Sequence, residues 1–171
     1  RKTTFIGTPN RIYDRISGDG AKERDLQQPI LFDSWLDSLG TDQPFFTFFL
    51  LDAPHEPYSY PKEFVRFEPS VNDINYLSLD KHVDIEPFYN HYKNAVNYSD
   101  HVIGEFLDTI KKRDLLKNSI VIITSDHGAE FYEHGFWGHN SAFTKEQVMA
   151  PFILYLPGKD AKKIDAITSH L

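Results

Sequence analysis

The sequence of 171 residues contains no cysteine. Disulfide bonds, thiolate metal sites and a cysteine nucleophile are therefore excluded within these residues. A chain without thiols suits a reducing or an oxidising compartment equally well. The cysteine count alone does not indicate where the protein resides.

Long apolar runs are also lacking. The longest, residues 45–51, is interrupted by Thr47 and falls far below the roughly 20 residues that a membrane helix needs. We therefore expect no membrane-spanning helix within this sequence.

Positive charge is in the minority, because 18 Lys and Arg residues stand against 25 Asp and Glu residues, for a formal net charge of −7. Such a chain has no cationic field to attract a nucleic acid or an anionic membrane surface. Aromatic residues are plentiful instead, with 14 Phe and 9 Tyr. Disordered segments are poor in aromatics, so we predict a globular domain with a packed core.

Two helices are predicted from the spacing of apolar residues. After an irregular lead-in over residues 1–26, apolar residues recur at helical intervals from Ile30 to Leu39, before a stop at Gly40. The clearest helix is predicted over residues 87–113, where basic residues occupy the last turns. Its predicted apolar face consists of Tyr89, Tyr92, Val96, Ile103, Phe106, Leu107 and Ile110.

Three runs of apolar or β-branched residues predict buried strands, at residues 45–51, 119–124 and 151–156. Residues 54–86, rich in Pro, Tyr, Ser, Asn and Asp, predict a long surface loop. A helix between two buried strands makes a βαβ crossover, which favours a three-layer α/β/α sandwich with a largely parallel sheet. Both ends of the chain look cut, so we interpret residues 27–171 as part of a larger domain.

A carboxylate and an imidazole, Asp126 and His127, directly follow the second predicted strand. Ligands of parallel sheets bind beyond the carboxyl ends of the strands, and both side chains are good ligands for Zn²⁺ or Mn²⁺. Residues 126–140 hold three histidines and three glycines. We interpret this loop as a metal-assisted phosphoryl or sulfuryl site. The alternative is a polar loop with surface histidines.

His55 follows the first predicted strand and is expected to face the same pocket as the second loop. Taken alone, it is typical of a turn histidine, and the pairing of the two loops is what favours a functional role. Glu130, Glu133 and His134 are interpreted as support for the loop rather than as direct ligands.

The order of these motifs resembles the sulfatase branch of the alkaline phosphatase superfamily. The resemblance rests on Ser125-Asp126-His127-Gly128 after a strand, on Trp137-Gly138-His139, and on a strand led by Pro151. It covers most of residues 27–171 and extends to three further segments, at residues 55–58, 92–104 and 118–124. It implies an alkaline phosphatase-like fold.

A narrower resemblance is to inner-membrane sulfatase-like proteins of Gram-negative bacteria. It is found in Ser59-Tyr60-Pro61, in Phe67-Glu68-Pro69 and in residues 138–143 followed by Gln147. It implies a domain that faces the periplasm and is anchored in the bacterial inner membrane through upstream helices.

The resemblance also implies a role for each candidate residue. Asp126 and His127 would bind a divalent metal ion (Zn, Mn or Ca), and His139 and His55 would contact the anionic group of the substrate. A His at position 139, where true sulfatases tend to have Lys, tilts the expected chemistry towards phosphate. Relatives carry their nucleophile, a Ser, Thr or formylglycine-forming Cys, upstream of anything present here, so we expect this segment alone to be inactive.

The function implied is that of a metal-dependent hydrolase, or a phosphoethanolamine-type transferase, acting on a sulfate or phosphate ester. A second hypothesis is a catalytically lapsed domain that binds lipid head groups as a sensor. Retention of Asp126, His127 and His139 favours the enzyme. A third hypothesis is a plain structural α/β domain.

Overall fold

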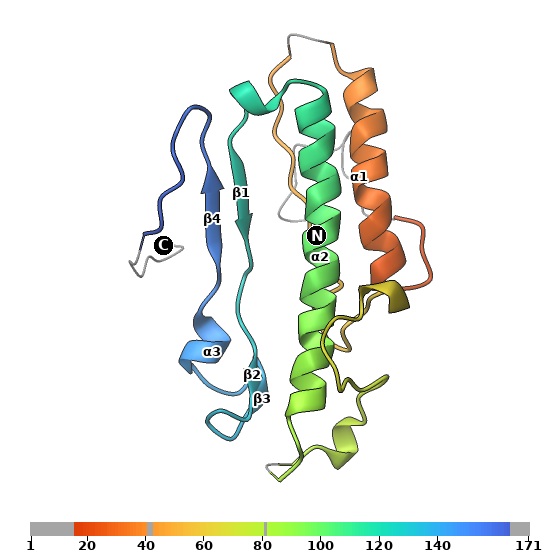
Figure 1. Ribbon diagram of the computed structural model, residues 1–171, viewed down its shortest axis with the longest axis vertical. Helices are drawn as coiled ribbons and strands as arrows, with labels where there is room; N and C mark the ends of the chain where they lie inside the picture. Colours follow the sequence, from red (N-terminus) through yellow and green to blue (C-terminus); the bar gives the residue numbers. More distant parts are fainter. Residues whose placement is uncertain (1–15, 41–42, 81, 165–171) are drawn as a thin grey trace. The chain divides into compact units, whose positions relative to one another are not determined.

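The computed structural model describes residues 16–40, 43–80 and 82–164, which belong to two compact units, Arg1–Thr109 and Ile110–Leu171 (Figure 1). The first unit contains one long helix, all but the last three residues of a second long helix, and a long loop. The second contains four short strands and a short helix. Each unit is considered by itself.

Helix α1 spans Ala21–Ser38 and so begins inside the predicted lead-in. The prediction of an irregular segment is therefore wrong for residues 21–26, while residues 1–15 lie outside the described part of the chain. The apolar spacing begins only at Ile30. The preceding turns are nevertheless helical, although they contain Pro29, and the buried side chains of Asp25 and Gln28 fix them in place. The helix ends at Ser38, close to the predicted stop at Gly40.

Helix α2 spans Glu86–Lys112, which confirms the longer predicted helix. Figure 1 shows α1 and α2 side by side, and the rings of Phe32 and Phe106 lie 5.9 Å apart between them. The hydroxyl of Tyr98 donates a 2.6 Å hydrogen bond to the carbonyl of Lys22 in α1. The predicted apolar face is only partly right, because Tyr89 and Val96 are exposed.

Asparagine side chains on α2 bind the backbone of the loop that precedes the helix, and Asn94 makes the most such bonds. Its Oδ1 accepts the N–H groups of Arg66 and Phe67 at 2.8 and 2.9 Å, and its Nδ2 donates to the carbonyl of Phe67 at 3.0 Å. Asn90 donates to the carbonyl of Pro69. Buried amides thus replace the backbone partners that this irregular segment lacks.

His91, also buried in α2, binds the same loop with both ring nitrogens. Nδ1 lies 2.6 Å from the hydroxyl of Tyr60, and Nε2 lies 3.1 Å from the carbonyl of Pro57. Burial lowers the pKa of His91, which favours the neutral ring. A carbonyl can only accept, so Nε2 carries the proton and Nδ1 accepts from Tyr60.

The loop over residues 54–85 confirms the predicted surface excursion. Its described part contains two 3₁₀ turns, Lys62–Phe64 and Tyr76–Ser78, and neither an α-helix nor a strand.

Residues 45–51 are extended but form no strand, so this prediction is wrong for the described residues. Phe45 and Phe49 turn inwards against Phe32, with ring centroids at 6.3 and 5.1 Å. The alternate residues Phe46 and Phe48 are 87% and 68% exposed. The segment therefore has the period of a strand buried on one face, without a paired neighbour in the part of the chain that the structure describes.

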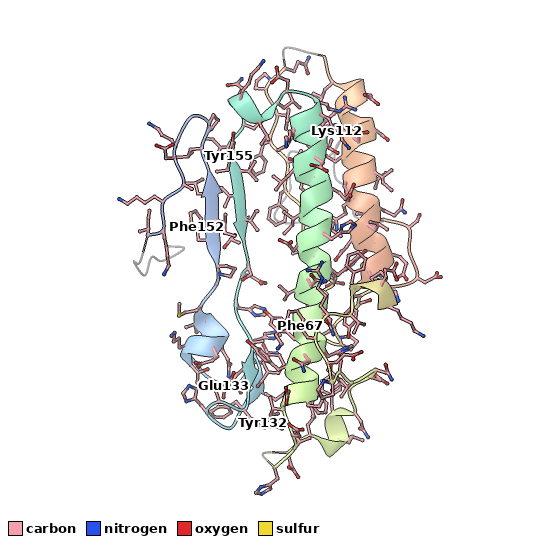
Figure 2. The ribbon with its side chains drawn as sticks, in the orientation of Figure 1. Phe67, Lys112, Tyr132, Glu133, Phe152 and Tyr155 are labelled. Atoms are coloured by element: carbon pink, nitrogen blue, oxygen red, sulfur yellow. The ribbon has the colours of Figure 1, made fainter. Side chains whose placement is uncertain are left out.

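In the second unit, strand β1 (Val121–Thr124) pairs with β4 (Phe152–Tyr155), and β2 (Glu130–Phe131) pairs with β3 (Trp137–Gly138). The strands predicted at residues 119–124 and 151–156 are therefore confirmed. Both pairs are antiparallel, so the predicted parallel pairing and βαβ crossover do not occur among the described residues. The described residues thus combine α-helices with antiparallel β-strands. Phe152 and Tyr155 mark the two ends of β4 in Figure 2.

The remaining elements of this unit are short. A 3₁₀ turn, Leu116–Asn118, precedes β1, and helix α3, Lys145–Val148, precedes β4. Of the helices within the described ranges, none is both long enough and apolar enough to cross a bilayer.

Replacing Asn94 by Leu tests whether α2 holds the loop. The substitution keeps the branched shape of a side chain that is fully buried, but it leaves the N–H groups of Arg66 and Phe67 without their acceptor. We expect a loss of about 2–3 kcal/mol in the free energy of unfolding, measured by urea denaturation.

Asn97→Ala is the matched control, because Asn97 makes a single 3.1 Å bond to the carbonyl of Phe64 and is half-buried. It should cost about 1 kcal/mol or less. Equal losses in the two variants would show that water replaces the Asn94 amide.

Candidate active site

The turn after β1 is built from Ser125, Asp126, His127 and Gly128. Ser125 Oγ donates to the carbonyl of His127 at 3.0 Å, and Asp126 Oδ1 accepts the N–H of His127 at 3.1 Å. Side chains of this kind stabilise tight turns by bonding to their own backbone. The carboxylate of Asp126 remains 82% exposed, so it is free to bind a ligand from solvent.

His127 is held in one orientation by its neighbour. Its Nδ1 lies 2.8 Å from the carbonyl of Gly128, which makes Nδ1 the protonated nitrogen and leaves the lone pair on Nε2. Nε2 lies 3.7 Å from Asp126 Oδ1. Metal-binding histidines commonly donate their other ring N–H to a carbonyl in this way, so the two side chains fit adjacent ligands of a divalent ion. No group of three potential ligands is found among residues 16–40, 43–80 and 82–164.

His139 lies directly against His127. The two ring centroids are 3.9 Å apart and the ring planes differ by 20°. The sequence separates these residues by a whole hairpin, β2 and β3, which folds the chain back. The structure therefore brings together three of the four predicted site residues, Asp126, His127 and His139.

His55 belongs to the first unit, where it lies on an exposed turn after the extended segment. Its Nδ1 is 2.9 Å from the carbonyl of Glu56, and its N–H donates to the carbonyl of Asp52. That His55 faces the same pocket as His139 stays a prediction.

The turn that carries His55 is anchored by a residue that sequence reasoning missed. Asp25, buried in α1, accepts the N–H groups of Asp52 and Ala53 at 2.9 and 2.7 Å and receives a bond from Gln28. Burial raises the pKa of Asp25, although its backbone hydrogen bonds oppose this shift. The sequence did not indicate this contact, because Asp25 is a polar residue within a segment that was predicted to be irregular.

Gly128 lies so close to α3 that no side chain fits. Its N–H donates to the carbonyl of Gln147 at 2.9 Å. A Cβ atom at this position would lie 2.1 Å from the carbonyl oxygen of Glu146 and 2.8 Å from that of Met149. The close approach of two backbones, rather than a special φ angle, requires glycine here.

Glu130 was predicted to support the loop, and the structure shows a carboxylate with 0% exposure and four hydrogen bonds. Oε1 accepts the N–H groups of His134 and Phe136 at 2.8 and 3.1 Å. Oε2 accepts Thr144 Oγ1 at 2.6 Å and Gln147 Nε2 at 3.0 Å. Glu130 thus ties the hairpin to α3.

The other two supporting residues lie at the hairpin turn, where Figure 2 labels Tyr132 and Glu133. Glu133 Oε2 accepts the N–H of Phe131, and His134 Nε2 lies 2.9 Å from Glu146 Oε2. Glu133 has its partner within the loop and His134 has its partner in α3, in agreement with a supporting role.

The four donors also decide the ionisation of Glu130. Burial alone would raise its pKa, but the bonds from Thr144, Gln147 and the two backbone N–H groups lower the pKa to about 2. The carboxylate is therefore charged at neutral pH and only accepts hydrogen bonds.

Comparisons with known proteins agree on one family. The family model described as Sulfatase matches residues 10–171. Mouse iduronate 2-sulfatase is 30% identical over 154 residues, which cover 69% of this chain and 27% of the relative. An endo-4-O-sulfatase of Bacteroides thetaiotaomicron is 25% identical over 140 residues, covering 73% of this chain and 26% of the relative.

A third relative is named for a different activity. The phosphoethanolamine transferase EptC of Escherichia coli is 29% identical over 110 residues, covering 60% of this chain and 18% of the relative. The chain thus spans about a quarter of the length of the sulfatases that it matches.

Gly128→Ala should displace the turn from α3, because the new methyl group would overlap the carbonyl of Glu146. We expect a loss of about 1–3 kcal/mol in the free energy of unfolding, measured by urea denaturation. Gly104→Ala is the control, since its Cβ would meet nothing within 4 Å and the helix would gain propensity. Similar losses in both variants would contradict the close approach.

Glu130→Gln tests the ionisation of the buried carboxylate. A group whose pKa is lower in the folded chain stabilises it above the unfolded pKa, here 4.5, and loses that contribution as the pH falls towards about 2. The free energy of unfolding of the wild type should therefore exceed that of the variant most at neutral pH. This difference in stability should shrink between pH 4.5 and 2. Urea unfolding across this range measures it, and a constant difference would contradict the lowered pKa.

Proposed function

Because the chain belongs to the sulfatase family, within the alkaline phosphatase superfamily, we propose that the intact protein is a metal-dependent hydrolase or transferase of sulfate or phosphate esters. Relatives of this chain include sulfatases and a phosphoethanolamine transferase. The observation that carries the proposal is the contact of His139 with His127, whose Nε2 lies beside Asp126.

In this proposal Asp126 and His127 bind a divalent metal ion, Zn, Mn or Ca. Bound there, the ion would stabilise negative charge on the ester oxygens. The carbonyl of Gly128 orients His127 by holding its Nδ1 proton, which keeps Nε2 available as a ligand. The remaining ligands and the nucleophile, a Ser, Thr or formylglycine, belong to parts of the protein outside this chain.

His139 contacts the anionic sulfate or phosphate group. An imidazole donates a hydrogen bond to an oxyanion in either protonation state, and it attracts the anion further when charged. The His127 ring against its face fixes the plane of His139 and excludes water from that side. His55, on the turn anchored by Asp25, is proposed as a second contact to the same group.

The finer assignments follow the sequence likeness. A His at position 139 and the similarity to EptC favour a phosphate over a sulfate ester. The proposed location is the bacterial inner membrane, where upstream helices anchor the protein and the domain faces the periplasm. The proposed substrates are sulfate or phosphate esters, including those of lipid head groups. The intact domain is proposed to complete a three-layer sandwich around a largely parallel sheet.

Metal content tests the proposal in the intact protein. We expect near-stoichiometric zinc, manganese or calcium by plasma mass spectrometry, and loss of the metal in Asp126→Ala. Turnover of sulfate or phosphate esters should fall at least about 100-fold, because metal-held charge stabilisation is worth several kcal/mol.

Asp160→Ala is the matched control, since Asp160 is an exposed aspartate of the same unit outside the site, and it should keep metal and turnover. Normal turnover in Asp126→Ala would contradict the assignment of Asp126. Absence of metal from both wild type and variant would favour the lapsed domain that binds lipid head groups.

A further inference from the structure

Gln147 is the most extensively bonded side chain of α3, although it contributes nothing to the proposed chemistry. It is only 2% exposed. Its Oε1 accepts the N–H groups of Ser141 and Ala142 at 3.4 and 3.1 Å, and its Nε2 donates to Ser141 Oγ at 3.1 Å. The same Nε2 donates to Glu130 Oε2 at 3.0 Å. Every polar atom of the amide is therefore used.

The backbone of the same residue reaches a second loop. The carbonyl of Gln147 accepts the N–H of Gly128 at 2.9 Å. Gly128 directly follows His127, and Ser141 lies two positions after His139. One residue thus holds the loops that carry both stacked imidazole rings.

We propose that Gln147 is a positioning residue of the site, which holds His139 against His127 by binding the loop after His139 and the turn after His127. This inference rests on the proposed function, because it assigns Gln147 a role in aligning the metal ligand with the contact to the substrate anion. Gln147 itself touches neither metal nor substrate.

Glu130 determines which way the amide points. A carboxylate offers only acceptors, so the amino group of Gln147 must face Glu130 and its carbonyl oxygen must face Ser141 and Ala142. If the amide were reversed, its oxygen would face the carboxylate oxygen of Glu130. Its amino group would then face the backbone N–H groups of Ser141 and Ala142. The orientation that binds the His139 loop is therefore fixed from within the unit.

This arrangement specifies a compensating pair of substitutions. Gln147→Glu alone brings a second carboxylate against Glu130 and removes the donor. In Glu130→Gln/Gln147→Glu the amide and the carboxylate exchange places, so that position 130 donates to position 147. The carboxylate oxygens introduced at position 147 would still accept from Ser141 and Ala142. The double variant should recover the stacked rings, and Gln147→Glu should not.

The first readout is the cross-ring nuclear Overhauser effect between His127 and His139, measured in the 171-residue chain with labelled histidine. We expect this signal in wild type, its loss in Gln147→Met, and its recovery in the compensating pair. Thr144→Val is the matched control. It removes a different bond to Glu130 without touching those of Gln147, so the signal should remain.

The second readout is kcat/KM of the intact protein on phosphate and sulfate esters. Gln147→Met should lower it about 10–100-fold, as expected for a residue that orients a site group, and Thr144→Val should stay within about threefold. Retention of the ring contact in Gln147→Met would overturn the positioning role, as would equal effects of Gln147→Met and Thr144→Val.

Failure of the proposed function would look different. If Gln147→Met lost the ring contact but kept wild-type kcat/KM, the link from Gln147 to the two rings would be supported, and the assignment of His139 as a substrate contact would be overturned.

Discussion

The charge on Glu130 is the constraint on which the second unit depends. A carboxylate shielded from water is costly unless each oxygen is compensated, and here each oxygen accepts two hydrogen bonds. Two of the four donors come from the hairpin turn, and the other two are Thr144, just before α3, and Gln147 within α3. Satisfying one buried carboxylate therefore joins the hairpin to α3.

The first unit uses the same solution where regular structure is missing. Asp25 accepts the backbone N–H groups of the turn before His55, and Asn94 accepts those of Arg66 and Phe67. A long loop carries many backbone groups that neither a helix nor a sheet satisfies. Buried Asp and Asn side chains on rigid helices supply the partners. They convert irregular segments into ordered surfaces that can present side chains such as His55.

Local signals were enough to predict the helix over residues 87–113, the strands β1 and β4 and the turn with Asp126 and His127, because spacing and adjacency determine them. The pairing of strands was predicted incorrectly, since apolar runs show that strands exist but not which neighbour they meet. Residues 45–51 illustrate this, because their outward face remains exposed. The start of α1 was not predicted because Asp25 and Gln28 are polar and add nothing to the apolar spacing. Only the folded chain shows that both side chains are buried.

The two halves of the candidate site are therefore held by contacts of different range along the sequence. The proposed metal half is local: Asp126, His127 and Gly128 are consecutive, and the carbonyl of Gly128 orients the ring that precedes it. The proposed anion contact is not local, because His139 reaches His127 only through a hairpin and a loop whose backbone is bound by Gln147. A motif search finds the first half from four consecutive residues, Ser125 to Gly128. The second half requires Glu130 and Gln147, seventeen residues apart, and substitutions there can separate the two halves without altering any residue of the motif.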